Sequence, residues 1–149
     1  MDDATRGRLL VAAQFGALAG WLVLGPRLSP WPAGVAVQLL GVGLGAWAAV
    51  WMTVRQRRAF SVTPLPDAHP RLVTDGPYRW IRHPMYTALL AIVLPGALAG
   101  GLPSVAAGVW LVGVLWIKHR FEDGLLAARF GAEHAAWRRR TGGLLPFLG

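Results

Sequence analysis

The stretch MYTALLAIVLPGALAGGLPSVAAGVWLVGVLWI, from Met85 to Ile117, contains no charged residue. As a single helix it would be about 50 Å long, whereas the hydrocarbon core of a membrane is about 30 Å thick. Gly100, Gly101 and Pro103 interrupt it near the middle and are poor residues for a helix interior. The stretch therefore predicts a tight hairpin of two short membrane helices, the first of which Pro95 is expected to kink.

Two further apolar stretches precede this hairpin, at Leu9–Leu24 and Ala33–Val54. The first is short for a span of about 20 residues, but its flanking residues can extend it. The second is long enough to cross and carries Gln38 as its only strongly polar side chain. A proline-rich turn at 29–32 separates them, so the pattern predicts an all-α integral membrane protein with about four transmembrane helices.

The composition supports the same class of protein. Hydrophobic residues make up 54% and charged residues 15% of the chain, compared with about 25% charged residues in ordinary soluble domains. The net charge of +8 could indicate nucleic acid, but the charges cluster beside the apolar runs, as at the cytoplasmic ends of membrane helices. We therefore expect membrane lipid and no nucleic acid among the partners. The chain has no cysteine, which excludes thiolate metal sites and a cysteine nucleophile.

The basic residues outside the apolar stretches define an expected topology. Six of them fall between the second and third stretches, six fall in the tail and none falls in the hairpin turn. Because basic residues stay on the cytoplasmic side of a membrane, we expect both termini in the cytoplasm, in a multi-pass protein of the cell inner membrane. The central connection and the tail would then share one side and form a single site.

One membrane-embedded domain accounts for residues 1–149. Its parts are the first two spans (1–58), a cytoplasmic loop (59–84), the helical hairpin (85–117) and a cytoplasmic tail (118–149). In the tail, 118–129 can continue the last helix into water, Gly131 can interrupt it and 132–140 can form a second short helix. The apolar end at 144–148 is expected to lie on the membrane interface or to pack back on the core.

The loop ends in a segment, 72–86, that is dense in groups able to bind a polar ligand. Its aromatic side chains, Tyr78 and Tyr86 among them, offer flat faces for a purine. His83 precedes Pro84, a residue suited to the first turn of a helix, where free N–H groups can receive a carboxylate. The alternative is an interfacial belt, because tryptophan, tyrosine and arginine are common where helices enter a membrane.

A second segment, Lys118–Asp123, opens the tail. A helix places Lys118 and Glu122 one turn apart on the same face, and Glu122 is a candidate acceptor for hydrogen bonds from a ribose diol. The alternative is an exposed ion pair, which stabilises a helix by only about 0.2–0.5 kcal/mol. The four histidines show no metal-ligand spacing, so no metal site is expected.

The two segments carry a family resemblance. One reads Gly76-Pro77-Tyr78 … Arg82-His83-Pro84-Met85-Tyr86, and the other reads Glu122-Asp123-x-x-Leu126-x-x-x-Phe130-Gly131. They resemble the G-x-Y-x-x-x-R-H-P-x-Y motif and the E-E-x-x-L-x-x-x-F-G tail of isoprenylcysteine carboxyl methyltransferases, over about residues 60–149. R-H-P-x-Y alone is also similar to phospholipid methyltransferases and to sterol C14-reductases.

The resemblance implies S-adenosylmethionine as the cofactor, held between the loop and the tail. The positions that it assigns to the cofactor are Pro70, Arg71, Leu72, Val73, Tyr78, His83, Pro84, Met85, Tyr86 and Glu122. A substrate-side arginine of the family is Lys118 here, which offers a point charge instead of a bidentate fork. Arg120 is the second candidate for this catalytic role, although it faces elsewhere on an ideal helix. Asp123 keeps the charge of a second family glutamate.

The expected function is methyl transfer from S-adenosylmethionine to a lipophilic small-molecule or lipidated acceptor, with a carboxylate as the first choice. A phospholipid amine is the second possible acceptor. Two different functions also fit parts of the pattern: an NADPH-dependent reductase similar to sterol reductases, and a non-enzymatic membrane protein whose basic tail binds anionic lipid. The small number of spans and the acidic pair in the tail argue against the reductase. The sequence leaves the oligomeric state open.

Overall fold

The computed structural model describes residues 2–24, 28–56 and 72–146. Its elements are α1 (Asp3–Val23), α2 (Pro32–Gln56), the short 3-10 helix η1 (Gly76–Arg79), α3 (Pro84–Ala99) and α4 (Leu102–Arg138). An isolated parallel bridge joins Ile81 to Gly142, and the described ranges contain no strand. The predicted all-α class is therefore confirmed for the part of the chain that the structure describes.

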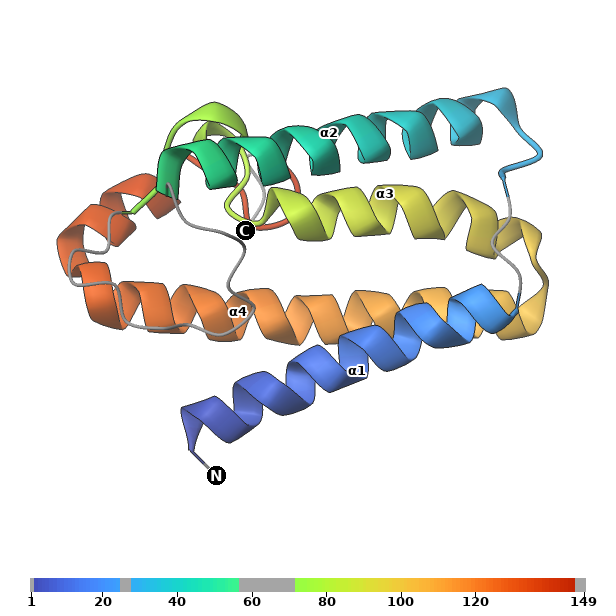
Figure 1. Cartoon of the computed structure of the whole chain (residues 1–149), viewed down its shortest axis with the longest axis horizontal. Helices are drawn as coiled ribbons and strands as arrows, with labels where there is room; N and C mark the ends of the chain where they lie inside the picture. The colour runs from blue at the N-terminus through green and yellow to red at the C-terminus, as the bar shows by residue number, and fades with distance from the viewer. Residues whose placement is uncertain (1, 25–27, 57–71, 147–149) are drawn as a thin grey trace.

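The four long helices lie side by side in one bundle (Figure 1). α2 packs on α3, α3 packs on α4, and α4 packs on α1. One end of the bundle holds the turn between α3 and α4, while the other end gathers the start of α1, η1, the start of α3 and the last turns of α4. The described part of the central connection and the tail thus meet at the same end, as a shared site requires.

The turn between α3 and α4 forms where the glycine pair predicted it. α3 ends at Ala99 and α4 begins at Leu102. Gly101 has a φ of +80°, a conformation that residues with a side chain rarely adopt. Pro103 lies in the first turn of α4, where its missing N–H would have had no helical partner. Pro95 lies inside α3, which continues through it.

α2 and α3 approach each other closely through small residues. A Cβ added at Gly41 of α2 would stand 2.8 Å from the Cβ of Ala91 in α3, so only glycine fits there. The buried Gln38 adds polar contacts, because its side chain donates to the Ile92 carbonyl at 3.0 Å and accepts from the Ser29 amide at 2.9 Å. Close backbones and a few interhelical hydrogen bonds are typical of helices that associate within a membrane.

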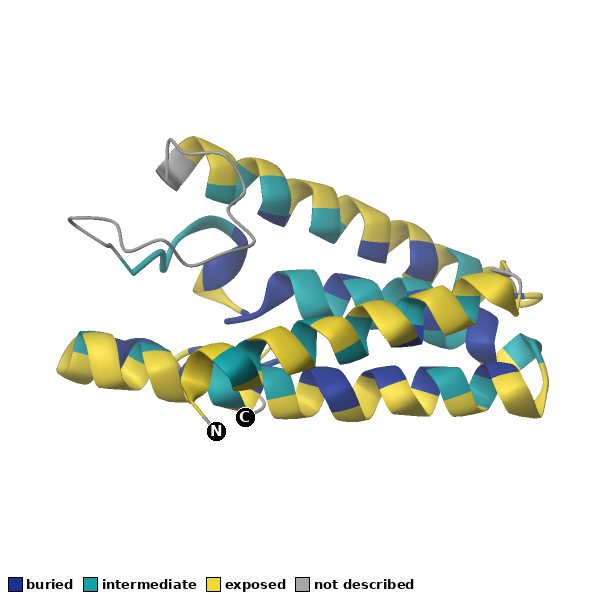
Figure 2. Ribbon diagram, turned by 60° about the horizontal axis from the view of Figure 1, so that its bottom comes forward, coloured by how far each residue is buried: buried dark blue, intermediate teal, exposed yellow. Residues whose placement is uncertain are grey.

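Exposed residues, yellow in Figure 2, lie along the outward faces of the helices. Many of the exposed residues have large apolar side chains. α2 from Pro32 to Val54 and α4 are long and apolar enough to cross a membrane. Only 17% of the most apolar part of α2 and 33% of that of α4 are buried, whereas the core helix of a soluble protein would be mostly buried. α3 is apolar but has 16 residues. These helices have the surface of a membrane protein.

α4 extends well beyond its apolar part, which ends at Ile117. Within it, Gly131 has a φ of +49° and a ψ of −117°, which bends the helix. Past the bend, the Trp137 indole donates a hydrogen bond to the Tyr78 carbonyl of η1 at 2.9 Å. The predicted continuation of the last helix beyond its apolar part and its interruption at Gly131 are both present. In the tail, Leu144 is buried, whereas residues 147–149 lie outside the described ranges.

Candidate functional site

The segment between η1 and α3 pairs with the chain that follows α4. The Arg82 amide donates to the Gly142 carbonyl at 2.8 Å, and the His83 amide donates to the Gly143 carbonyl at 3.2 Å. A Cβ added at Gly143 would lie 3.3 Å from the His119 ring, so the tight approach favours a residue without a side chain. This pairing holds the loop motif against the tail.

Gly76 sets the path of the chain into this segment. It has a φ of +58°, and a Cβ added there would overlap the indole of Trp51 in α2. The same indole donates a hydrogen bond to Asp75 Oδ1 at 3.0 Å. The chain therefore turns at Gly76 and Pro77, at the start of η1, and this turn is fixed against the end of α2.

Arg82 anchors the site from a buried position. Its side chain is 1% exposed, and Nε donates to Asp123 Oδ2 at 3.1 Å. Its Nη1 donates to the Thr141 carbonyl at 2.6 Å and to the Arg138 carbonyl at 3.4 Å. The guanidinium thus joins the loop, α4 and the tail. A buried charge is tolerated only when it is paired and hydrogen-bonded in this manner.

His83 lies between two carboxylates of α4. Its Nε2 is 3.0 Å from Asp123 Oδ1, and its Nδ1 is 3.4 Å from Glu122 Oε2. Burial opposes the charged ring, but hydrogen bonds and charges of Asp123 and Glu122 outweigh burial and raise the pKa of His83 above 6.5. The imidazole stacks parallel to the Tyr86 ring, with 5.4 Å between the ring centres.

The two carboxylates differ in their access to solvent. The Asp123 side chain is 9% exposed, whereas that of Glu122 is 35% exposed. Burial alone would raise the pKa of Asp123, but its contacts with His83 and Arg82 lower it to about 2. Burial is likewise outweighed at Glu122, whose pKa is lowered by hydrogen bonds from His83 and Tyr86. Both groups are therefore ionised at neutral pH, and Glu122 keeps an accessible edge.

Tyr86 and Lys118 complete the accessible side of the cluster. The Tyr86 hydroxyl donates to both oxygens of Glu122, at 2.7 and 2.8 Å. Lys118 Nζ donates to Gln14 Oε1 of α1 at 2.8 Å and lies 5.0 Å from the centre of the Tyr86 ring. A neutral amide and an aromatic face contact this ammonium, and the nearby Glu122 carboxylate, which also interacts with it, carries the opposite charge.

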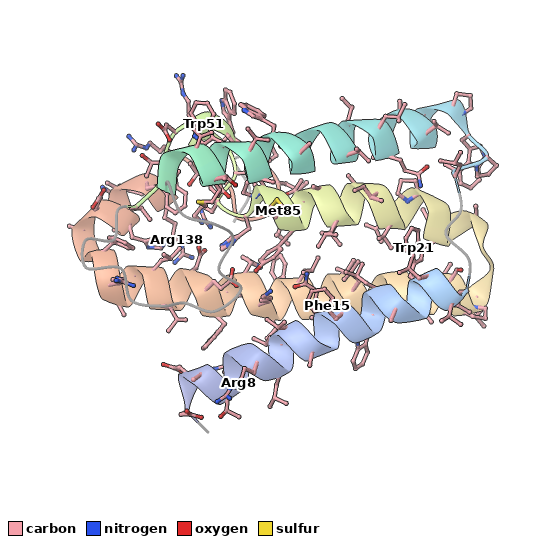
Figure 3. All side chains as sticks on the ribbon, viewed as in Figure 1. Arg8, Phe15, Trp21, Trp51, Met85 and Arg138 are labelled. Atoms are coloured by element: carbon pink, nitrogen blue, oxygen red, sulfur yellow. The ribbon has the colours of Figure 1, made fainter. Side chains whose placement is uncertain are left out.

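The predicted site residues that meet in this cluster are His83, Tyr86, Lys118 and Glu122. Pro84 is buried at the first position of α3. Met85 follows it at the end of the bundle where Trp51 and Arg138 also lie (Figure 3).

The other predicted residues lie elsewhere. Tyr78 is buried within η1, and Leu72 and Val73 are partly buried before it. Pro70 and Arg71 fall outside the described residues. Arg120 lies on another face of α4, with its guanidinium 5.6 Å from the centre of the Trp116 ring.

Sequence reasoning did not assign Arg82, Asp123, His134 or Thr141 to the site. Arg82 and Asp123 stand inside the two motifs, and an arginine in one motif facing an acidic pair in the other is the signal that could have found them. His134 is buried, with Nε2 at 3.7 Å from Asp123 Oδ1. Only the bend in α4 brings it there, and no local sequence pattern reveals that contact.

Several groups of the cluster match those that the expected cofactor, S-adenosylmethionine, would contact. The accessible Glu122 carboxylate has lone pairs beyond those that Tyr86 uses, so it can accept from hydroxyl or ammonium groups. The stacked rings of His83 and Tyr86 lie directly beside it. α3 begins at Pro84, which has no N–H, and the Tyr86 and Thr87 amides donate to the His83 carbonyl at 3.0 and 3.2 Å. Among the first amides of α3, that of Met85 can therefore receive a carboxylate.

Comparison with known proteins adds one match. A sequence model of the phospholipid methyltransferase family matches residues 33–133. The match includes α2, the loop motif, α3 and α4 as far as its bend. No curated protein and no solved structure matches the chain.

Proposed function

Because the chain belongs to the phospholipid methyltransferase family, whose members are membrane methyltransferases, we propose that it methylates a lipophilic acceptor with S-adenosylmethionine as the donor. The contact of the accessible Glu122 carboxylate with Tyr86 and His83 carries this proposal, since it joins the two motifs that the resemblance assigns to the cofactor. The family match also favours methyl transfer over the NADPH-dependent reductase and over a purely lipid-binding role.

The residues of the cluster have distinct roles in this proposal. Glu122 accepts hydrogen bonds from the ribose hydroxyls, the Tyr86 ring lies beside the nucleoside, and the Met85 amide at the start of α3 receives the carboxylate. His83, whose side chain is 8% exposed, supports Tyr86 and Glu122 from its buried position. S-adenosylmethionine supplies an electrophilic methyl group on a positively charged sulfur. The buried Asp123 contacts both Arg82 and His83, and these contacts fix the position of His83 behind the accessible groups. Positioning supplies most of the rate when two reactants are held in line, so a rigid anchor matters more than an acid or a base.

The methyl transfer exchanges one bond for another. The carbon–sulfur bond breaks as the methyl carbon bonds to the acceptor atom, and the sulfur keeps the electron pair. A carboxylate acceptor becomes a methyl ester and needs no general base, because it already carries the attacking charge. An amine acceptor must first lose a proton to water before its lone pair can attack.

A carboxylate is the acceptor that Lys118 favours. Its ammonium lies beside the Tyr86 ring and one helical turn from Glu122, so it can hold an anion near the methyl group. The apolar part of the acceptor would reach this point from the bilayer. Arg120 is left out of the proposed site, because its side chain lies on another face of α4.

A phospholipid amine is the second candidate acceptor. The description of the matching family as phospholipid methyltransferases favours it. The acidic side chains of Glu122 and Asp123 would also attract a protonated headgroup amine, although Lys118 would repel it.

We also propose four spans with both termini in the cytoplasm of a multi-pass inner-membrane protein. α3 is about 24 Å long, and it packs between α2 and α4, which have the length of full spans. α1 has 21 residues, with its arginines near its start. The start of α1 and the basic tail lie at the same end of the bundle (Figure 1), which agrees with the positive-inside pattern.

Labelling with methyl-labelled S-adenosylmethionine tests the proposed function. Membranes that contain the protein are incubated with it, and the labelled product in the lipid phase is identified by mass. Mild base separates the two acceptors, because a methyl ester releases volatile methanol whereas an N-methyl group stays on its headgroup. Label that base releases supports the carboxylate, and stable label on a phospholipid supports the amine. No label above that of membranes with Glu122→Gln would reject both.

A further inference from the structure

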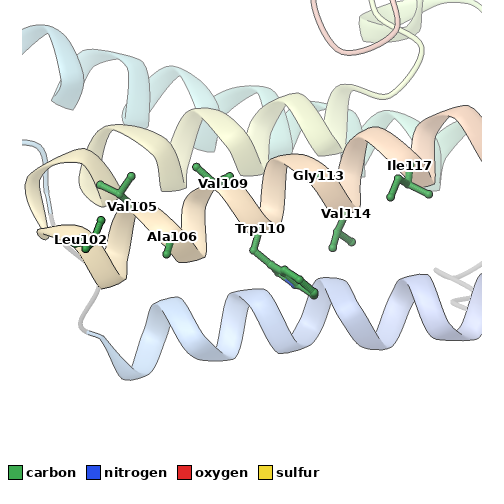
Figure 4. A pocket seen from close by; sticks show the side chains of 8 residues that line it. All are labelled: Leu102, Val105, Ala106, Val109, Trp110, Gly113, Val114 and Ile117. Carbon is green, nitrogen blue, oxygen red and sulfur yellow. The ribbon is translucent and has the colours of Figure 1, made fainter.

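Two adjoining hollows lie on a different face of α4 from the proposed methylation site. One is a cleft of about 670 Å³ between the first turns of α1 and the part of α4 from Trp116 to Ala128. The other is an apolar groove of about 560 Å³ along α4 from Leu102 to Ile117 (Figure 4). Ile117 lines both, so an elongated ligand can occupy the two together.

Two arginines stand at the polar end of these hollows. The Arg6 guanidinium lies 4.9 Å from the centre of the Phe121 ring, and that of Arg120 lies 5.6 Å from the centre of the Trp116 ring. Within the described ranges, neither guanidinium has a hydrogen bond or an ion pair with another residue. Stacking on an aromatic ring fixes a guanidinium in space and leaves its N–H edge available to an anion such as phosphate.

The charge of the cleft selects for an anion. Arg6 and Arg120 contribute two positive charges, and Asp3 is the single acidic residue among those that line it, so the formal charge is +1. The cleft lies where the apolar part of α4 gives way to charged residues. This is the level at which lipid phosphates meet the hydrocarbon core.

We propose that the cleft and the groove bind one anionic phospholipid. Its phosphate lies on Arg6 and Arg120, headgroup hydroxyls face Asp3, and an acyl chain lies along the groove of α4. The lipid would tie α1 to α4, since Arg6 and Arg120 come from different helices. Because this site lies on another face of α4 from Lys118 and Glu122, the lipid is a bound partner and is not the methyl acceptor.

Native mass spectrometry of the purified protein in neutral detergent tests this proposal. Phosphatidylglycerol, phosphatidylcholine and phosphatidylethanolamine with the same acyl chains are added separately. We expect one tightly retained phosphatidylglycerol. We expect Arg6→Gln/Arg120→Gln to weaken its binding about thirty-fold, as the loss of two arginines near a lipid surface implies. Arg8→Gln/Arg129→Gln changes the net charge equally outside the cleft and should keep binding within about three-fold.

Several results would overturn the proposal. Equal retention of phosphatidylglycerol and phosphatidylcholine, tighter retention of phosphatidylethanolamine, or the same loss in both double variants would each do so. Competition by glycerol phosphate at concentrations equal to those of the lipid would mean that the chains contribute nothing. Should the double variant aggregate, Arg120→Gln alone gives the same comparison at a smaller expected loss. No methyl transfer is measured, so failure here is distinct from failure of the proposed function.

Discussion

Glu122 and Asp123 are neighbours in the sequence but occupy different environments. Arg82 and His83 enclose Asp123, whereas Glu122 keeps an accessible edge beside Tyr86. Asp123 therefore stabilises the fold, whereas the accessible edge of Glu122 suits the ligand-binding role that we propose. These two residues of equal charge have different surroundings because successive side chains of a helix point about 100° apart.

The environment of Asp123 predicts how stability depends on pH. Its pKa is about 2 in the folded protein and 3.8 in an unfolded chain, so its ionised form stabilises the fold above about pH 4 and that contribution is lost as the pH falls towards 2. Asp123→Asn should lower stability at pH 7 by about 3–5 kcal/mol, because Arg82 keeps a buried charge without its carboxylate. Thermal unfolding in detergent between pH 7 and about pH 2.5 measures both effects. An unchanged unfolding temperature at pH 7 would contradict this role.

Lys118 distinguishes the two proposed acceptors. Lys118→Met keeps much of the side-chain length and removes the charge, so with a carboxylate acceptor it should reduce turnover strongly and cofactor binding only mildly. Lys118→Arg should keep activity, because a guanidinium offers a bidentate grip. The assay is methyl transfer by both variants, with S-adenosylmethionine binding measured separately by calorimetry. Full activity of Lys118→Met would reject the carboxylate and favour the phospholipid amine.

Local signals explain which site residues the sequence could predict. His83, Tyr86 and Glu122 stand in spaced motifs, and their mutual contacts are present. Arg120 is a sequence candidate because it could compensate for the family arginine that Lys118 replaces, but a shift of two positions turns a side chain to another face of a helix, and its guanidinium lies by Trp116. Gln14, which holds Lys118, lies over a hundred residues away and has no local signal. Contacts of this kind depend on how α1 packs on α4.

At the scale of elements, glycine, proline and charge mark boundaries that the sequence shows directly. Gly101 ends the hairpin turn with a positive φ, and Gly131 bends α4 with another. The bend at Gly131 sets the direction of the residues that follow, and the sequence does not show which residues they will then contact. That direction brings Trp137 to η1 and His134 to Asp123.

Replacing a glycine of α4 by alanine should change stability in opposite directions at the bend and in the regular part of the helix. Gly131→Ala places a side chain at a φ of +49° and should destabilise the protein by about 1–3 kcal/mol. Gly124→Ala meets no atom within 4 Å of the added Cβ and should stabilise the helix by up to about 1 kcal/mol. Thermal unfolding of both variants in one detergent provides the comparison. If Gly131→Ala were as stable as the wild type, the bend would not depend on glycine.

At the scale of the whole molecule, the two ends of the bundle carry different groups. The polar cluster, the basic tail and the start of α1 gather at one end, and the glycine turn lies at the other (Figure 1). A water-soluble cofactor and a lipid acceptor can meet only where the bundle leaves the bilayer. The positive-inside pattern predicts that this end faces the cytoplasm.

Reporter fusions test this orientation. A reporter inserted after Gly101 should report from the outside of the inner membrane, and a reporter fused after Gly149 should report from the cytoplasm. The physical reason is the absence of basic residues in the hairpin turn and their abundance in the tail. Insertion after Arg58, which lies outside the described residues, should also report from the cytoplasm. An external signal from either cytoplasmic position would contradict the four-span topology.

Calorimetric binding of S-adenosylmethionine to the purified protein tests the central claim most directly, with Glu122→Gln and Glu133→Gln as a matched pair. Each variant removes one negative charge from α4, but Glu133 is exposed beyond the bend. The wild type should bind the cofactor saturably. Glu122→Gln should weaken binding about ten-fold to a hundred-fold, as the loss of a charged hydrogen bond worth about 1.5–3 kcal/mol implies, and Glu133→Gln should leave it unchanged. No binding by the wild type, or equal binding by the two variants, would contradict the account.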